Sequence, residues 1–134
     1  MLLAIDVGNT QTHIGAFAHD DLAEHWRFAT SGEDTADELA VRLTSLLALR
    51  GIHLGSIDAS IVCSVVPRLI PEYSRMTADY LGAPCTLVGP GIRSGMPVLL
   101  DNPHELGADR LVNAVAAYER FAARFPRRFR FPPS

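Results

Sequence analysis

The chain has 134 residues, 48% of them hydrophobic and 20% charged, with a formal net charge of −3 at pH 7. This composition is typical of a globular domain with a core, and the acidic balance argues against nucleic acid or an anionic membrane as a partner. No apolar run approaches the ~20 residues that span a bilayer. Met1 leads directly into an apolar run instead of a secretory leader, so we expect a cytoplasmic protein.

The sequence contains no lysine, and all twelve basic residues are arginines. A P-loop needs a lysine that reaches the terminal phosphates, and a protein-kinase site needs a strand lysine for the same purpose. Both kinds of site are therefore excluded. Phosphate chemistry in this chain must depend on backbone N–H groups, hydroxyls, arginine and metal.

Three strands are predicted at the N-terminus. The apolar run 2–5 predicts a buried strand that ends on the carboxylate of Asp6. Further strands, roughly 12–17 and 22–30, follow after short polar turns, and the alternation of the third is imperfect. Successive strands with short turns predict an antiparallel meander at one side of a sheet.

Helices and strands alternate after this meander. Thr35 and Glu38 form a capping-box pattern, and leucines recur at helical spacing until Gly51, which predicts a helix over about 36–50. Three further elements follow: a strand over 58–66, a helix from Pro67 to Gly82 and a strand over 84–88. The buried face of that helix is predicted to consist of Leu69, Ile70, Tyr73, Met76 and Tyr80. After these we expect an extended piece over 97–100 and a helix from a capping-box candidate at 102–105 through Tyr118. The order βββαβαβα predicts an α/β fold with a mixed sheet.

Residues 121–134 mix arginine and phenylalanine, end in prolines and have no helical or strand period. We expect a domain over 1–120 followed by a disordered or aberrant tail, in preference to a nucleic-acid-binding segment. Cys63 and Cys85 lie in apolar strand-like runs, which favours buried, reduced thiols over a disulfide. The five histidines show no metal-ligand spacing, and Ser64 lies on a strand without the nucleophile elbow of a hydrolase.

The first candidate site is the polar run that follows the first strand. Gly8 and Asn9 are residue types that tolerate positive φ in tight hairpin turns, and Thr10 and Thr12 add hydroxyls. Backbone N–H groups in such a turn can form a nest for phosphate oxygens, beside an acid that holds Mg²⁺ through water. An ordinary hairpin capped by Asp6 explains the same short motif, so both interpretations stay open.

The second candidate site is Gly107–Arg110, at the start of the last predicted helix. Asp109 can serve as a helix N-cap, which is the simpler interpretation of this residue alone. Alternatively, Arg110 and the helix dipole bind an anion, and Asp109 accepts a hydroxyl proton in phosphoryl transfer. Two acids from distant stretches make a plausible kinase pair.

Four motifs, in this order and spacing, give the chain a family resemblance: Asp6–Thr10, Ser64–Pro67, Asn102-Pro103 and Gly107–Arg110. From residue 1 to about 120 it resembles type III pantothenate kinase, of the acetate and sugar kinase, Hsp70 and actin superfamily. The resemblance implies an actin-like (ribonuclease H-like) fold, with the strand over 58–66 beside the first strand of a five-stranded sheet. It also implies ATP-dependent phosphorylation of the 4′-hydroxyl of pantothenate, the first step of coenzyme A synthesis.

The resemblance also implies site residues and cofactors. The ATP-phosphate contacts would come from Asp6, Val7, Gly8, Asn9, Thr10, Gln11, Thr12 and His13, with Asp6 holding Mg²⁺ through water. Asp109 would be the general base, within a pantothenate site of Gly107, Ala108, Asp109, Arg110 and Leu100. Leu100 stands where many members carry a tyrosine. Family members also use a monovalent cation (K⁺ or NH₄⁺) and form homodimers.

Family members have two actin-like domains, and the expected continuation after Phe121 is absent from this sequence. That continuation would carry a second phosphate motif, the aspartate that binds the monovalent cation, and the adenosine site. We therefore expect a truncated, poorly active form that corresponds to the first half of the enzyme. The alternative is a non-enzymatic binding, dimerisation or regulatory module derived from the same fold.

Overall fold

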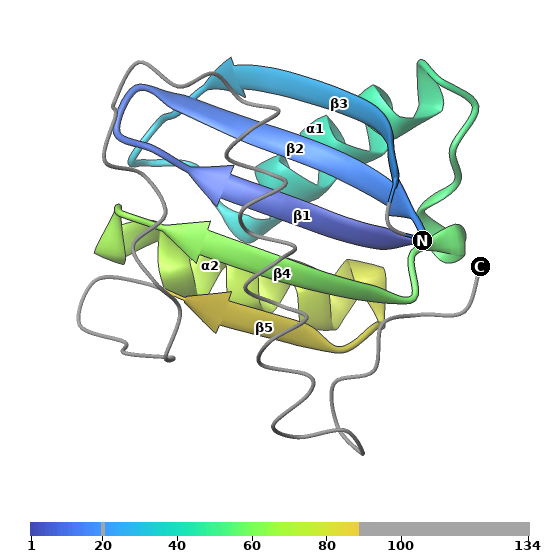
Figure 1. Ribbon diagram of the computed structural model, residues 1–134. Coiled ribbons are helices and arrows are strands. Elements are labelled where there is room, and N and C mark those ends of the chain that lie inside the picture. The colour runs from blue at the N-terminus through green and yellow to red at the C-terminus, as the bar shows by residue number, and fades with distance from the viewer. Residues whose placement is uncertain (20, 89–134) are drawn as a thin grey trace.

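The computed structural model describes residues 1–19 and 21–88, and the fold is built from these (Figure 1). The predictions for the segment over 97–100, for the last helix and for the tail over 121–134 lie outside the described residues. Within the described part, every predicted strand and helix is present.

A five-stranded mixed sheet forms the centre of the fold, with the strand order β3-β2-β1-β4-β5 (Figure 1). The first three strands pair antiparallel as a meander, whereas β4 pairs parallel with β1 and β5 pairs parallel with β4. The strands are β1 (Leu2–Val7), β2 (Gln11–Ala18), β3 (Asp21–Ala29), β4 (Ala59–Ser64) and β5 (Cys85–Val88). This confirms the predicted meander, the mixed sheet and the place of the fourth strand beside the first.

Helix α1 (Ala36–Ala48) begins and ends as its sequence predicts. The Thr35 hydroxyl accepts the N–H of Glu38 at 3.2 Å, and the Glu38 carboxylate accepts the N–H of Thr35 at 3.3 Å, so the capping box is complete. Gly51 has φ of 72°, and the next N–H donates to the carbonyl of Leu47 at 3.0 Å. This is the Schellman arrangement, which needs a left-handed residue after the helix.

The second helical segment is less regular than predicted. It consists of a 3₁₀ turn (Pro67–Leu69), α2 (Ile70–Met76) and a π turn (Thr77–Leu81). The predicted burial of Tyr80 is wrong, since its side chain is 47% exposed and Leu81 is buried instead. A π turn adds a residue to the helical repeat, which rotates the following side chains away from the face that a 3.6-residue period predicts.

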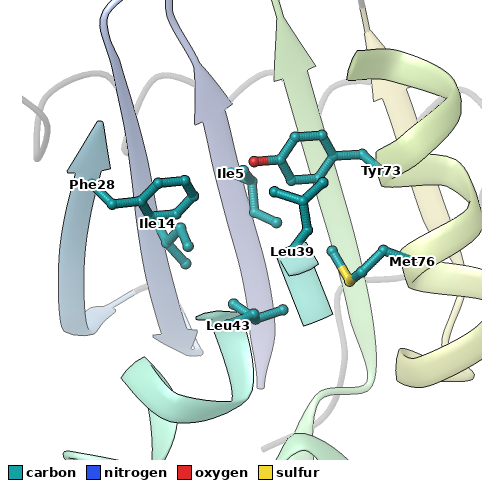
Figure 2. A pocket seen from close by; sticks show the side chains of 7 residues that line it. All are labelled: Ile5, Ile14, Phe28, Leu39, Leu43, Tyr73 and Met76. Atoms are coloured by element: carbon teal, nitrogen blue, oxygen red, sulfur yellow. The ribbon is translucent and has the colours of Figure 1, made fainter. Parts of the chain in front are cut away.

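Both helices cover one face of the sheet, which we call the helix face (Figure 1). Its core combines alternate residues of β1 with buried leucines of α1 and with Tyr73 and Met76 of α2. Figure 2 shows seven of these side chains around a small apolar void that leaves no room for a water molecule. A separate buried cluster lies on the opposite face, and its members are Leu2, Ala4, Phe17, Ala59 and Ile61. The alternation within β1 therefore supplies two cores.

The imperfect alternation of β3 has a structural cause. The register with β2 shifts between Ala16, which pairs with Glu24, and Phe17, which pairs with Leu22, so Ala23 is an extra residue. Such a bulge turns the residues on its two sides to different faces of the sheet. Trp26 accordingly belongs to the helix-face core, whereas Leu22 packs against the opposite cluster.

Candidate functional site

A tight turn joins the two central antiparallel strands of the sheet. The N–H of Gly8 donates to the carbonyl of Gln11 at 2.9 Å, while Asn9 and Thr10 are exposed at the tip. The N–H of Thr30, just after β3, donates to the carbonyl of Thr10 at 2.9 Å. The turn is thus tied to both strands that flank β2.

The backbone of this turn does not use the positive φ that its residue types tolerate. Neither Gly8 nor Asn9 has a positive φ, and the left-handed residue is His19, with φ of 56° in the second hairpin. A hairpin can reverse direction with both central residues at negative φ, as in a type I turn.

Asp6 lies beside the turn, at the carboxyl end of β1, and is only 5% exposed. His13 of β2 is its antiparallel partner, and Cys63 of β4 is its parallel partner. Side chains alternate along a strand, so Asp6 lies on the same face as Leu2 and Ala4, away from the helices. This face of the sheet therefore carries a carboxylate, an imidazole and a thiol on three neighbouring strands.

Thr12 lies on the other face and is fully buried. Its hydroxyl is 2.8 Å from that of Thr30, and either oxygen can donate. The buried Tyr73 hydroxyl faces the same place but has no hydrogen bond of good geometry among the described residues. Burial raises the pKa of Tyr73, and the nearby Thr12 hydroxyl offsets this only in part. Three hydroxyls thus gather beneath the turn.

An ion pair lies next to the three hydroxyls of Thr12, Thr30 and Tyr73. Arg42 of α1 donates to the buried carboxylate of Asp34 at 2.9 Å, and its guanidinium lies 4.8 Å from the centre of the Phe28 ring. The hydrogen bond from Asp34 holds the pKa of Arg42 above its ordinary value. The pair therefore joins the segment after β3 to the middle of α1.

The loop after β4 lies next to the turn as well. The N–H of Val65 donates to the carbonyl of Val7 at 3.0 Å, which extends the parallel ladder past the last residue of β4. The Ser64 hydroxyl accepts the N–H of Val66 and donates to its carbonyl, both at 3.0 Å. Ser64 thus shapes a bend in the backbone, in agreement with the sequence, which gave it no nucleophile motif.

The two cysteines lie on opposite faces of the sheet. Neither is in a disulfide, as predicted, but each is half-buried where full burial was expected. Cys63 packs on the face of Asp6, and Cys85 packs on the helix face. Burial raises the pKa of the Cys85 thiol, while Ser60 and Thr77 act in the opposite direction.

The structure places one of the two predicted sites. The predicted phosphate contacts from Asp6 to His13 are brought together around one hairpin, although Thr12 and His13 point to opposite faces. Leu100 and Gly107–Arg110, including the proposed base Asp109, lie outside the described residues. The three hydroxyls beneath the turn were not predicted from the sequence. A signal for one of them was present, because Thr12 and the apolar Ile14 are two residues apart in a strand and therefore share the inward face.

Residues 1–19 and 21–88 contain neither a metal-ligating cluster nor a membrane-spanning helix. Within these ranges no group of three or more His, Cys, Asp or Glu side chains is arranged to hold a metal ion. None of the helices there has the length and apolar character that a membrane span needs.

Solved structures with the same fold support the architecture. T. thermophilus RuvC, solved in complex with a Holliday junction substrate, superposes with a TM-score of 0.56 at 17% identity, over 92% of this chain and 94% of that one. A putative N-acetylglucosamine kinase from Porphyromonas gingivalis superposes with a TM-score of 0.53 at 19% identity, over 66% of this chain and 34% of that one. At such identities the likeness shows the fold alone, which is the predicted actin-like (ribonuclease H-like) fold.

Sequence relatives are closer. The family model described as type III pantothenate kinase matches residues 2–125. The type III pantothenate kinase of Streptomyces avermitilis is 50% identical over 126 residues, which are 90% of this chain and 48% of that protein. The type III pantothenate kinase of Myxococcus xanthus is 48% identical over 123 residues, 92% of this chain and 48% of that protein. The chain spans about half the length of these relatives, and it belongs to the type III pantothenate kinase family.

Proposed function

We propose that the chain supplies the ATP-phosphate-binding part of a kinase that phosphorylates the 4′-hydroxyl of pantothenate, the first step of coenzyme A synthesis. The observation that carries this proposal is the turn closed by the Gly8–Gln11 hydrogen bond, which directly follows a strand that ends in the buried Asp6. Family membership supplies the substrate class. ATP and pantothenate are accordingly the proposed substrates.

In the proposed mechanism, the turn positions the phosphates of ATP. Backbone N–H groups at Asn9 and Thr10 are at the exposed tip, where they can donate to phosphate oxygens. Thr12 supports the turn from beneath through Thr30, since its buried hydroxyl is engaged there. Phosphoryl transfer depends mainly on positioning and charge, so a rigid set of donors is a suitable device.

Mg²⁺ fits the residues present, which provide one carboxylate near the turn. Asp6 is the acid nearest the turn, and the described residues contain no larger ligand group. Mg²⁺ commonly keeps several waters and is held by one or two carboxylates together with substrate phosphates. Asp6 would hold the ion through water, and the ion would neutralise phosphate charge.

Asp109 is proposed as the general base that accepts the proton of the pantothenate hydroxyl. Gly107, Ala108 and Arg110 would line the substrate site with it, and Leu100 would offer an apolar contact in place of the tyrosine of many relatives. An aspartate next to an arginine can orient the attacking oxygen while the arginine holds an anion.

Several features of the whole protein belong to the same proposal. A monovalent cation (K⁺ or NH₄⁺), a homodimer and a cytoplasmic location are proposed from family membership. These 134 residues assayed alone should turn over slowly, because the family's phosphoryl transfer takes place in a cleft between two domains. Without a closed cleft, water screens the charge of the transferring group. A non-enzymatic binding or dimerisation module is the rival proposal, supported by the matched half of the relatives' length.

The test begins with the chain as given. MgATP binding is measured by calorimetry, and ADP release is measured with pantothenate, Mg²⁺ and K⁺. We expect MgATP binding with turnover far below the ~1–100 s⁻¹ of typical kinases. Turnover in that range would contradict the need for a second domain. A chain that binds a protein partner but no nucleotide would favour the rival module.

The proposed base is tested by Asp109→Asn in a form that carries both domains. We expect kcat to fall by about 10²-fold or more with a similar KM, since proton acceptance contributes on that scale. Asp101→Asn is the matched control, because this nearby acid has no proposed role. An unchanged kcat in the Asp109 variant would leave that residue as a helix cap.

A further inference from the structure

Tyr73 brings a polar atom to the edge of the apolar helix-face core. The side chain extends from α2 beneath the sheet, and its hydroxyl points away from α2 toward Ile5 and the β1–β2 hairpin (Figure 2). Tyr73 is 2% exposed, and among the described residues its hydroxyl has no hydrogen bond of good geometry. Burying such a group is unfavourable, so its nearest polar neighbours are the place to look for a role.

Those neighbours lead toward the candidate site. The Thr12 hydroxyl is close enough to act on the Tyr73 hydroxyl, without a hydrogen bond of good geometry between them, and its oxygen lies 2.8 Å from that of Thr30. The backbone N–H of Thr30 donates to the carbonyl of Thr10, at the exposed tip of the turn, at 2.9 Å. A change at Tyr73 can therefore reach the turn through two threonines without crossing solvent.

The tyrosine can influence the direction in which the hydrogen bond between Thr12 and Thr30 runs. A hydroxyl donates one hydrogen bond and can accept others, and the bond between Thr12 and Thr30 can run in either direction. A Tyr73 hydroxyl that donates to Thr12 occupies one acceptor site of Thr12 and favours the direction in which Thr12 donates to Thr30. Thr30 is half-buried just after β3, and in that direction its own proton is left for another acceptor. A phosphate oxygen is such an acceptor.

We propose that Tyr73 is a positioning residue of the phosphate-binding turn, which it orients through the hydroxyls of Thr12 and Thr30. This inference rests on the proposed function for its ligand, a nucleotide or inorganic polyphosphate. The effect of Tyr73 on the turn itself is independent of that ligand.

The test compares Tyr73→Phe with Tyr80→Phe in the 134-residue chain. Both variants lose only a hydroxyl, and Tyr80 is the matched control because its exposed hydroxyl donates to Asp37 at 2.6 Å, away from the turn. The first measurement is amide hydrogen exchange at Gly8 and Thr30, whose N–H groups close the turn. The second is the affinity for inorganic tripolyphosphate, with adenosine as a ligand that lacks phosphate.

We expect Tyr73→Phe to lower protection at Gly8 and Thr30 and to weaken tripolyphosphate binding about two- to tenfold, the range for one hydrogen bond. The Tyr80→Phe variant should match the wild type, and adenosine, which lacks phosphate, should not bind any of the three proteins measurably. Protection at both amides equal to that of the wild type would overturn the inference, even with a lower melting temperature. A third outcome is possible, in which Tyr73→Phe loses protection at both amides but the wild-type chain binds no tripolyphosphate. This outcome would refute the proposed function and the phosphate role of Tyr73, but not its support of the turn.

A second variant covers the case in which Tyr73→Phe folds poorly. Thr12→Val keeps the shape of the side chain and breaks the path at its middle. It should lower protection at the same two amides, and adding Tyr73→Phe to it should lower that protection no further, since residues on one path are not additive. Independent, additive effects of the two substitutions would overturn the inference.

Discussion

The two faces of the β1–β2 hairpin carry different chemistry, although their residues alternate one by one. Toward the helices lie Val7 and Thr12, in a packed interior with a hydroxyl pair. On the opposite face lie Asp6 and His13, directly paired across the strands. The residues that support the turn and the residues that carry ionisable side chains thus lie on opposite faces of the same sheet. We expect substitutions on the helix face to act on stability and to reach ligand binding only through the turn, whereas substitutions of Asp6 on the other face should act on ligand binding directly.

The largest expected effect is on the helix face. Leu39→Ala removes a buried α1 side chain that borders the void between α1, α2 and the sheet (Figure 2). Enlarging a void in a core should lower the free energy of unfolding by about 2–5 kcal/mol, measured by urea denaturation. Leu49→Ala, at a side chain that is 75% exposed, is the control and should stay within about 0.5 kcal/mol of the wild type. Equal losses in both variants would contradict a packed helix face.

On the opposite face, Asp6→Asn tests the chemistry. Removing this charge should weaken MgATP binding by about tenfold, as expected for one charge-assisted contact, with a smaller loss of stability than Leu39→Ala. Calorimetry measures the affinity. Asp58→Asn is the matched control at the other end of β1, where the carboxylate pairs with the N-terminal amine at 2.7 Å. Equal losses of affinity in both variants would mean a general electrostatic effect instead of a site.

A smaller effect is expected where α1 begins. Thr35→Ala removes the hydroxyl of the capping box and should lower the free energy of unfolding by about 1 kcal/mol. Thr44→Ala, the same substitution at an exposed position inside the helix, should be neutral or slightly stabilising, because alanine is the better helix former. MgATP affinity should be unaffected in both. A Thr35 variant as stable as the wild type would contradict the contribution of the cap.

The smallest expected effect is the response of the helix face to alkaline pH. Burial raises the pKa values of Cys85 and Tyr73 above their ordinary values, so both stay neutral in the folded chain while the unfolded chain ionises. The resulting stability is fully present below the unfolded pKa values and is lost as pH rises from those values through the higher folded pKa values. The urea midpoint should fall slightly between about pH 8 and 9.5, and less so in Cys85→Ala. An unchanged slope in that variant would exclude the thiol as the cause.

Local sequence signals predicted the parts of the fold that local contacts build. The capping box at Thr35 and the glycine stop at Gly51 are read from a few neighbouring residues, and the structure contains both. The order of strands followed from short turns and from the later alternation of strands with helices. The place of β4 beside β1 was predicted from this order of elements together with the family resemblance, because no local pattern specifies a partner so distant in sequence.

The remaining differences arise where a residue is inserted into a regular repeat. The π turn over Thr77–Leu81 moves Tyr80 to the surface, and the bulge at Ala23 moves Leu22 to the other face. Neither insertion has a distinctive residue type. Within the candidate site, the Asp6 motif identified the turn, but the burial of Tyr73 near Thr12 depends on packing between segments far apart in the chain. Such contacts follow from packing and have no signature in a single sequence.

The central place of β1 has a consequence for how the chain is made. Its antiparallel neighbour β2 follows immediately, but its parallel neighbour is complete only after β3 and α1, since Leu2 pairs with Ala59. During synthesis on a ribosome, one edge of the apolar run Leu2–Val7 therefore stays open while the meander and α1 emerge. Open apolar edges recruit other chains, and pairing between distant segments is slow. The first strand to be synthesised is thus the one that most needs protection until the parallel half of the sheet arrives.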